Sequence, residues 1–108
     1  MASYLLIESR DPFGSGGAGF CQDLSRRLVA GGDRVTLFLV ENGVLPARSG
    51  AADPGLTELA QAGVEVLADD FSLRERGIPL DRLRPGVKPA AIDLVIDRLA
   101  EGAKAIWH

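Results

Sequence analysis

The hydrophobic residues of this chain fall into short runs that glycine, proline and polar residues separate. The clearest run is Arg34 to Val44, within which Val35 to Val40 holds β-branched and aromatic side chains and no proline or glycine. Apolar side chains on both faces are typical of a parallel strand covered by helices on two sides. Asn42-Gly43 follows, and both residue types tolerate a positive φ. This run therefore predicts a buried strand that ends at a turn.

Three further runs have strand length and composition. They are Tyr4 to Glu8, Val64 to Ala68, and Ala103 to Trp107. Two other segments, Gly43 to Ala52 and Ile78 to Lys88, are interrupted by proline or glycine and predict loops.

Four segments are predicted to be helices. The first runs from about Gly17 to Ala30, and the second follows the N-cap signal Asp53-Pro54 and ends at Gly63. A short third helix is expected over Asp69 to Arg76, and a fourth from Pro89 to Gly102. The residues expected to face inward are Phe20, Cys21, Leu24 and Leu28 in the first, Leu56, Leu59 and Ala60 in the second, and Ile92, Val95, Ile96 and Leu99 in the fourth.

The alternation of strands and helices predicts the fold class. We expect one α/β domain over residues 1–108, a three-layer α/β/α sandwich with a mostly parallel sheet of four or five strands. In such sheets the ligand crevice lies at the carboxyl ends of the strands. The candidate ligand-binding residues that follow predicted strands are Asp11, Ser15, Asp69, Asp70 and Ser72.

Composition narrows the classes of function. The chain has 108 residues and a net charge of -3, which argues against a nucleic-acid binder. It has no apolar run long enough to span a membrane and no signal-peptide pattern at its start, so a cytoplasmic location is the expectation. A single cysteine excludes an internal disulfide and a cysteine-cluster metal site. Neither a cofactor nor a metal site is expected.

A glycine motif precedes the first helix. Gly14 to Gly19 has the spacing G-x-G-x-x-G, and Glu41 ends the next predicted strand. A dinucleotide site would use such glycines to approach a pyrophosphate and the acid to bind a ribose. Four residues separate the strand from the motif, whereas the dinucleotide turn is tight, which favours a flexible loop or a simpler anion site.

Four acids could meet at the same sheet edge. In phospho-accepting receiver domains, acids after the first and third strands hold a magnesium ion. Glu8, Asp11, Asp69 and Asp70 occupy comparable places, but the chain lacks a lysine at the end of its last strand. The simpler interpretation is that these acids are solvated loop residues and helix caps.

Cys21 could act as a nucleophile because it is the sole thiol. It falls on the apolar face of the first helix with Leu24 and Leu28, where a buried thiol stays protonated and inert. We therefore expect Cys21 to fill the core.

The segment Asp69 to Ile78 places polar residues where a short helix begins, directly after a strand. A cysteine at such a position would be held as a thiolate, whereas an aspartate is a good N-cap. A capping role for Asp69 is the simpler interpretation. Residues 71–88 also carry five bases and two acids, a pattern typical of a solvated face or of a surface for an acidic ligand.

Taken together, the chain resembles the DsrE/DsrF/TusD-like family of small sulfur-relay proteins. The resemblance covers nearly the whole length through four segments. These are Ser9-Arg-Asp-Pro12, Gly31-Gly-Asp-Arg-Val-Thr-Leu-Phe-Leu-Val-Glu-Asn-Gly-Val44, Gly63-Val-Glu-Val66 with Arg74-Glu-Arg-Gly-Ile78, and Ala103-Lys-Ala-Ile-Trp107. It implies an α/β/α fold, a homotrimer or hexamer, a sulfur-relay protein as a partner, and cytoplasmic sulfur trafficking.

The resemblance also implies where the sulfur-accepting cysteine would stand. Counted back from Arg76-Gly77, that position is Asp69, and a second cysteine of some members falls on Ser72. A carboxylate cannot hold a persulfide, so relay chemistry does not carry over to residue 69.

Two hypotheses follow. The first is an oligomeric, non-catalytic DsrE-like protein of sulfur metabolism. The second is a small anion- or nucleotide-binding module that uses the crevice at the carboxyl ends of the strands. Sulfur transfer through Cys21 is a third possibility, for which we expect a negative result.

Overall fold

The computed structural model describes residues 1–11, 19–51 and 54–108. Five strands form one sheet in the order β4-β3-β2-β1-β5, and every neighbouring pair runs parallel. The strands are β1 (Ser3–Glu8), β2 (Arg34–Leu39), β3 (Glu65–Asp69), β4 (Val87–Ala90) and β5 (Lys104–Trp107). The α/β class and the mostly parallel sheet are therefore confirmed, with five strands.

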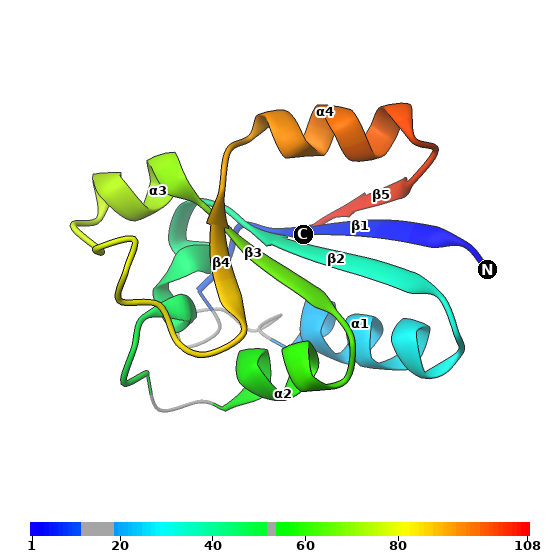
Figure 1. Ribbon diagram of the computed structural model, residues 1–108, viewed down its shortest axis with the longest axis horizontal. Helices are drawn as coiled ribbons and strands as arrows, with labels where there is room; N and C mark the ends of the chain where they lie inside the picture. The colour runs from blue at the N-terminus through cyan, green and yellow to red at the C-terminus, as the bar shows by residue number, and fades with distance from the viewer. Residues whose placement is uncertain (12–18, 52–53) are drawn as a thin grey trace.

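Helices cover both faces of this sheet, as Figure 1 shows. The first face carries α1 (Phe20–Ala30) and α2 (Gly55–Gln61), and the opposite face carries α4 (Asp93–Ala100). The short helix α3 (Asp70–Glu75) follows β3 at the carboxyl end of the sheet. A 3-10 helix, η1 (Glu41–Ala47), follows β2.

Alternate residues of each strand pack into two separate cores, because successive side chains of a strand point to opposite faces. Under α1 and α2 the core contains Leu6, Leu37, Leu39, Val66 and Ala68 together with Cys21. Under α4 it contains Leu5, Ile7, Phe38, Val40 and Leu67. Apolar residues on both faces of a strand thus produce the buried parallel sheet that the sequence predicts.

The predicted start of the last helix at Pro89 is wrong. Pro89 lies in β4, paired with Ala68 of β3, and α4 begins later at Asp93. Because β4 is an edge strand, its outer side needs no ladder hydrogen bond, and an edge is where a sheet tolerates proline.

The predicted inward face of that helix is also wrong in part. Leu94 and Val95 pack against the core under α4, whereas Ile92, Ile96 and Leu99 are 52%, 69% and 47% exposed. The helix has apolar residues on two sides, so its spacing alone did not decide which side packs on the sheet. The outward side remains an apolar stripe on the surface.

The turn after β2 differs from the predicted loop in two respects. Residues 41–47 form η1, and the positive φ falls on Glu41, at 52°, rather than on Asn42 or Gly43. Gly43 is needed for a different reason: a Cβ at this position would overlap the backbone carbonyl oxygen of Glu8. The close approach of η1 to the end of β1 therefore requires glycine.

None of the helices in the described ranges is both long enough and apolar enough to cross a membrane.

We predict that Gly43→Ala destabilises the protein by at least about 2 kcal/mol, because the backbone of β1 must move to admit the methyl group. Gly31→Ala is the matched control, since Gly31 has a φ of -81° and only ordinary contacts around an added Cβ. Urea denaturation of both variants measures the difference. Equal stability of the two variants would contradict the close approach of η1.

Candidate functional site

The carboxyl ends of β2 and β3 border a surface hollow of about 420 Å³. It opens on the side of the sheet that carries α4, because Ile92 and Trp107 contribute to its wall. Its lining combines acids with exposed aromatic and aliphatic side chains. The lining residues are Val40, Glu41, Asp69, Phe71, Ser72, Glu75, Arg76, Ile92 and Trp107.

Asp69 caps α3 within this hollow, as the sequence predicts. Its Oδ2 accepts the Ser72 backbone N–H at 3.0 Å and the Ser72 hydroxyl at 2.6 Å. The Ser72 hydroxyl in turn accepts the backbone N–H of Glu41 at 2.9 Å. Asp69 is 6% exposed, and its Oδ1 is buried without a hydrogen-bond partner. This carboxylate thus holds α3 and the start of η1 together and keeps one acceptor unused.

The five candidate ligand residues do not all reach this hollow. Asp69 and Ser72 line it, whereas Asp70 forms an ion pair of 3.0 Å with Arg74, one helical turn away. Asp11 is half-buried outside the lining, and Ser15 lies outside the described residues, as do residues 14–18 of the glycine motif. A ligand-binding role for these residues stays a prediction.

The acids do not form the arrangement of a receiver domain. Within the described ranges, the one group of three potential metal-ligating side chains is Glu8, Cys21 and His108, and it includes neither Asp69 nor Asp70. Strand β2 separates β1 from β3 in the sheet, which keeps Glu8 apart from the residues that follow β3.

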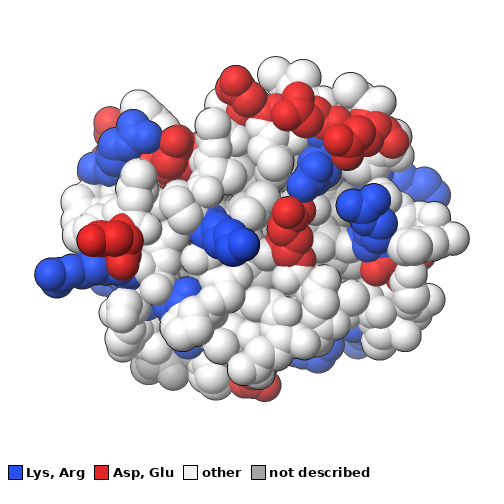
Figure 2. Space-filling model, in the orientation of Figure 1, with Lys and Arg blue, Asp and Glu red and all other residues white. Residues whose placement is uncertain are grey.

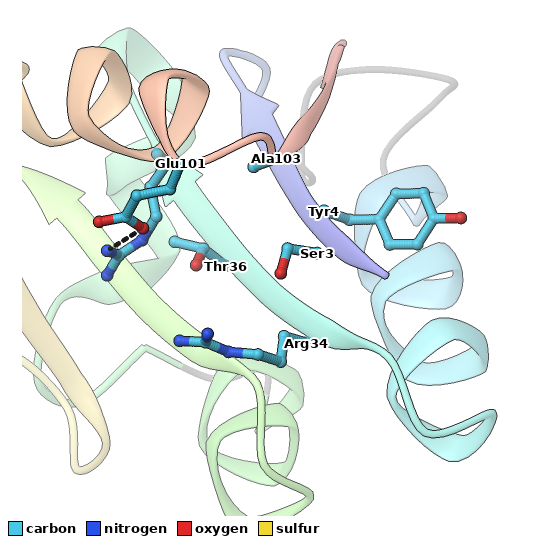
Figure 3. Close-up of a pocket in the computed structure, with 7 residues that line it drawn as sticks. Ser3, Tyr4, Arg34, Thr36, Glu101 and Ala103 are labelled. Atoms are coloured by element: carbon cyan, nitrogen blue, oxygen red, sulfur yellow. Dashed lines mark hydrogen bonds and ion pairs between the residues drawn. The ribbon is translucent and has the colours of Figure 1, made fainter. Parts of the chain in front are cut away.

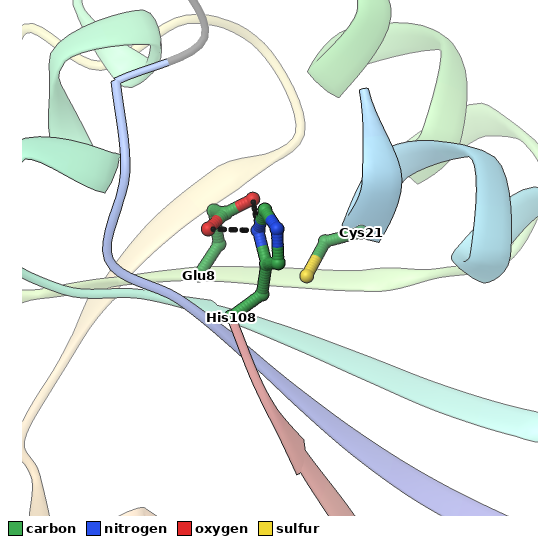
Figure 4. Close-up of side chains that lie close together, drawn as sticks. All are labelled: Glu8, Cys21 and His108. Carbon is green, nitrogen blue, oxygen red and sulfur yellow. Dashed lines mark hydrogen bonds and ion pairs between the residues drawn. The ribbon is translucent and has the colours of Figure 1, made fainter. Parts of the chain in front are cut away.

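Glu8, Cys21 and His108 meet at the carboxyl ends of β1 and β5 (Figure 4). Their ligand atoms all lie within 4.8 Å of one another. The His108 Nδ1 lies 3.0 and 3.1 Å from the two Glu8 oxygens, and the Cys21 sulfur points from the start of α1 toward this pair. The His108 ring also lies beside the Phe20 ring, with centroids 4.9 Å apart.

Sequence reasoning missed this cluster. Cys21 is buried in the core as expected, at 1% exposure, but a carboxylate and an imidazole are its neighbours. The available signal was that one predicted strand ends at Glu8 and that another is followed directly by His108. The pairing of β1 with β5 was the missing information, because Glu8 and His108 lie at opposite ends of the sequence.

Burial, the negative charge of Glu8 and a hydrogen bond to that carboxylate raise the pKa of the Cys21 thiol from 9.0 to about 12. Each of these causes favours the neutral thiol over the thiolate. A nucleophilic cysteine needs the opposite environment. The thiol is therefore unreactive as it stands.

The basic residues of the segment 71–88 have separate roles. Arg84 is buried and donates to the Pro46 carbonyl at 3.1 Å and to the Thr57 hydroxyl at 3.1 Å, so it is a structural residue. Arg76 and Arg82 line a second hollow of about 420 Å³ with Arg48. No acid belongs to the described lining of this basic hollow, and anion binding there stays a prediction.

A smaller hollow of about 60 Å³ lies at the opposite, amino-terminal edge of the sheet (Figure 3). Ser3, Arg34 and Thr36 line it with Arg98 and Glu101. Arg98 and Glu101 form an ion pair of 3.5 Å within it, and Arg98 also contacts Glu65 at 2.8 Å. This edge is not where α/β sheets bind ligands, and we assign it a structural role.

Solved structures share this fold, and two of them match nearly the whole chain. The ychN protein from E. coli has a TM-score of 0.91 and 19% identity, and the match covers 100% of both chains. MTH1491 from Methanobacterium thermoautotrophicum, described as a protein of unknown function, has a TM-score of 0.83 and 22% identity over 99% of this chain and 98% of that chain. No family model and no curated protein matches the sequence. The likeness shows the α/β fold alone.

We predict that the raised pKa of Cys21 makes the protein less stable as the pH rises above 9.0. The folded state binds the thiol proton more tightly than the unfolded state does, so this contribution is complete below pH 9.0 and declines as the pH rises toward about 12. Each pH unit in that window removes up to about 1.4 kcal/mol.

Urea denaturation of the wild type and of Cys21→Ala, at about pH 8 and about pH 10.5, measures this contribution. The stability of the wild type relative to the variant should fall by about 2 kcal/mol between the two values. Other groups that titrate there cancel in the comparison. A difference that stays constant with pH would contradict the raised pKa.

Proposed function

We propose that this protein is a cytoplasmic, oligomeric DsrE-like component of sulfur trafficking that holds no sulfur of its own at residue 69. The proposal rests on one observation, the buried and capping carboxylate of Asp69. At the position where the resemblance implies an acceptor cysteine, a buried carboxylate caps α3 through two hydrogen bonds from Ser72. Neither side chain offers a thiol.

The lone cysteine does not replace the missing acceptor in this proposal. Cys21 contributes to the core under α1 and α2, whereas the Asp69 hollow opens on the side of α4. Its raised pKa keeps it protonated, and a protonated thiol does not attack a sulfur donor. A protein of this kind would serve the pathway by binding, either to copies of itself or to a sulfur-relay protein.

An apolar surface supports self-assembly. We define it as Phe71 of α3, Ile92, Ile96 and Leu99 at α4, and Trp107 of β5. Ile96, Trp107 and Phe71 are 69%, 65% and 64% exposed. Exposed apolar patches of this kind mark interaction sites in soluble proteins. Acidic side chains gather beside this surface over α4, where they would form a polar rim (Figure 2).

The unused oxygen of Asp69 is a second argument for a partner at this hollow. A buried carboxylate oxygen without a donor is costly, and native proteins rarely leave one so. Because this oxygen has no surface of its own, a hydrogen-bond donor from a second copy, seated between Phe71 and Trp107, would reach it only after a local shift opens it to the hollow.

We predict that replacing Asp69 by cysteine creates a sulfur acceptor that the wild type lacks. The wild type and Asp69→Cys are incubated with a small-molecule persulfide, which transfers its outer sulfur to a thiolate and leaves as a thiol. Intact mass spectrometry then detects a one-sulfur adduct that a reducing agent removes. Asp69→Cys should gain one adduct, because a thiol at a helix start is held partly as thiolate, and the wild type should gain none.

Two controls interpret this experiment. Gln61→Cys, at the exposed end of α2, measures the uptake by a solvent-exposed thiol, and uptake at residue 69 should be faster. Asp69→Cys combined with Cys21→Ser assigns the adduct to the introduced thiol. A stable adduct on Cys21 of the wild type would overturn the proposal of a non-catalytic member.

We predict that the protein is a trimer or hexamer at micromolar concentration and that Ile96→Lys converts it to a monomer. A charge buried in an interface without a partner costs several kcal/mol, enough to dissociate the assembly. Light scattering after size exclusion measures the mass. Gln61→Lys adds the same charge to a helix on the other face of the sheet and should leave the mass unchanged. A monomeric wild type would refute the assembly.

A further inference from the structure

Three metal-ligating side chains of different chemistry converge beside the sheet, and the proposed sulfur-trafficking role does not use them. Glu8 ends β1, His108 follows β5, and Cys21 lies in the first turn of α1. Backbone hydrogen bonds hold the first two in register, because His108 N–H donates to the Ile7 carbonyl at 2.8 Å and Ser9 N–H to the His108 carbonyl at 3.0 Å. Rigid elements thus place an oxygen, a nitrogen and a sulfur donor within 4.8 Å of one another.

The charge balance of this cluster favours a cation. Glu8 is 6% exposed, and a buried carboxylate is costly unless a positive charge or several donors compensate it. It contacts the His108 ring, accepts the backbone N–H of Arg10 at 3.2 Å from Oε2, and accepts a hydrogen bond from the Cys21 thiol. The Arg10 side chain reaches the adjoining cavity, yet no ion pair joins it to Glu8 within the described ranges. The His108 contact is an ion pair only when the imidazole is protonated, whereas a metal ion would supply a permanent positive charge.

The size of the site suits a single ion. Ligands of a tetrahedral zinc ion stand roughly 3 to 4 Å apart, so small side-chain rotations would close the cluster around one. A cavity of about 10 Å³ adjoins Glu8 and Cys21, which is about the volume that one water-sized sphere occupies. Three protein ligands with room for one more is the pattern of an open zinc site.

The same three residue types also occur in nucleophilic triads, but the geometry does not favour that interpretation. A triad needs a hydrogen bond from the thiol to the imidazole. Here the hydrogen bond of the thiol goes to Glu8, which disfavours the ionised form, and no hydrogen bond joins Cys21 to His108 within the described residues. A metal removes this conflict, because it binds all three groups in their deprotonated forms.

We propose that Glu8, Cys21 and His108 bind one divalent transition-metal ion, with Zn²⁺ as the best match to an oxygen, nitrogen and sulfur donor set. On binding, the metal–sulfur bond replaces the S–H bond of Cys21, and the proton passes to solvent. His108 binds through a ring nitrogen that carries no proton, and Glu8 through a carboxylate oxygen. No oxidant or reductant takes part.

Cobalt titration of the whole protein tests this proposal. The protein is stripped with a chelator and titrated with CoCl₂, because Co²⁺ occupies zinc sites and gives a thiolate-to-metal charge-transfer absorption that Zn²⁺ lacks. The absorption should saturate at one equivalent and disappear when ZnCl₂ is added. Zn²⁺ should also raise the Tm of the stripped protein by at least about 5 °C when present well above its Kd.

Variants decide which residues are the ligands. Cys21→Ser should abolish the charge-transfer absorption, and His108→Gln and Glu8→Gln should each weaken Co²⁺ binding at least about tenfold. His108→Gln is the most informative, since His108 is partly exposed and contributes no side chain to either core. Glu101→Gln removes an exposed acid at the opposite edge of the sheet and should bind as the wild type does.

Three results would overturn the proposal: no charge-transfer absorption in the wild type, wild-type affinity in His108→Gln, or equal weakening in Glu101→Gln, which would indicate an adventitious surface ion. None of these results depends on sulfur uptake. A failure of the metal site is therefore distinguishable from a failure of the proposed function.

Discussion

The pairing of β1 with β2 on one side and with β5 on the other is the constraint on which the rest of this structure depends. It brings residues 3–8 and 104–107 side by side although they stand near opposite ends of the sequence. Because all five strands run parallel, their carboxyl ends meet at one edge. The Glu8 backbone carbonyl at that edge accepts the N–H of Val40 at 2.9 Å and has Gly43 packed against it. Both candidate sites derive from this arrangement.

The two sites lie at the same edge but on different faces of the sheet. Asp69 and Ser72 follow β3 and open toward α4, whereas Cys21 approaches Glu8 and His108 from α1. Asp69, at the position where the family resemblance implies a thiol, and the Cys21 thiol therefore belong to two separate sites. The sulfur of Cys21 is in a setting suited to holding a metal, and the Asp69 hollow is in a setting suited to contact with another protein.

Hydrogen bonds around Asp69 connect α3 to the residues that follow β2. Ser72 donates to Asp69 and accepts from Glu41, and Arg76 donates to the Asn42 side chain at 3.0 Å. The residues after β2 are therefore attached to α3, which carries Phe71 on the apolar surface. Glu41 keeps its positive φ within this network, and such backbone strain persists only where the surroundings hold it. A partner that contacts Phe71 would thus be coupled to the turn that packs on β1.

Local patterns in the sequence determined most of the architecture. Runs such as Val35 to Val40 specified strands buried on both faces, and Asp69 was recognisable as a helix cap because that role needs residues only three positions apart. The absence of a thiol at residue 69 is likewise a property of the sequence alone.

The tertiary structure decided what depends on distant segments. Proline at residue 89 was compatible with a helix start until the neighbour of β3 was known, and the apolar residues of α4 could not indicate which of its two sides would meet the sheet. The meeting of Glu8, Cys21 and His108 required the strand order, since nothing in the local sequence states that the last strand pairs with the first. Periodicity describes how a segment faces its surroundings, and only the packing of segments far apart in the sequence determines what those surroundings are.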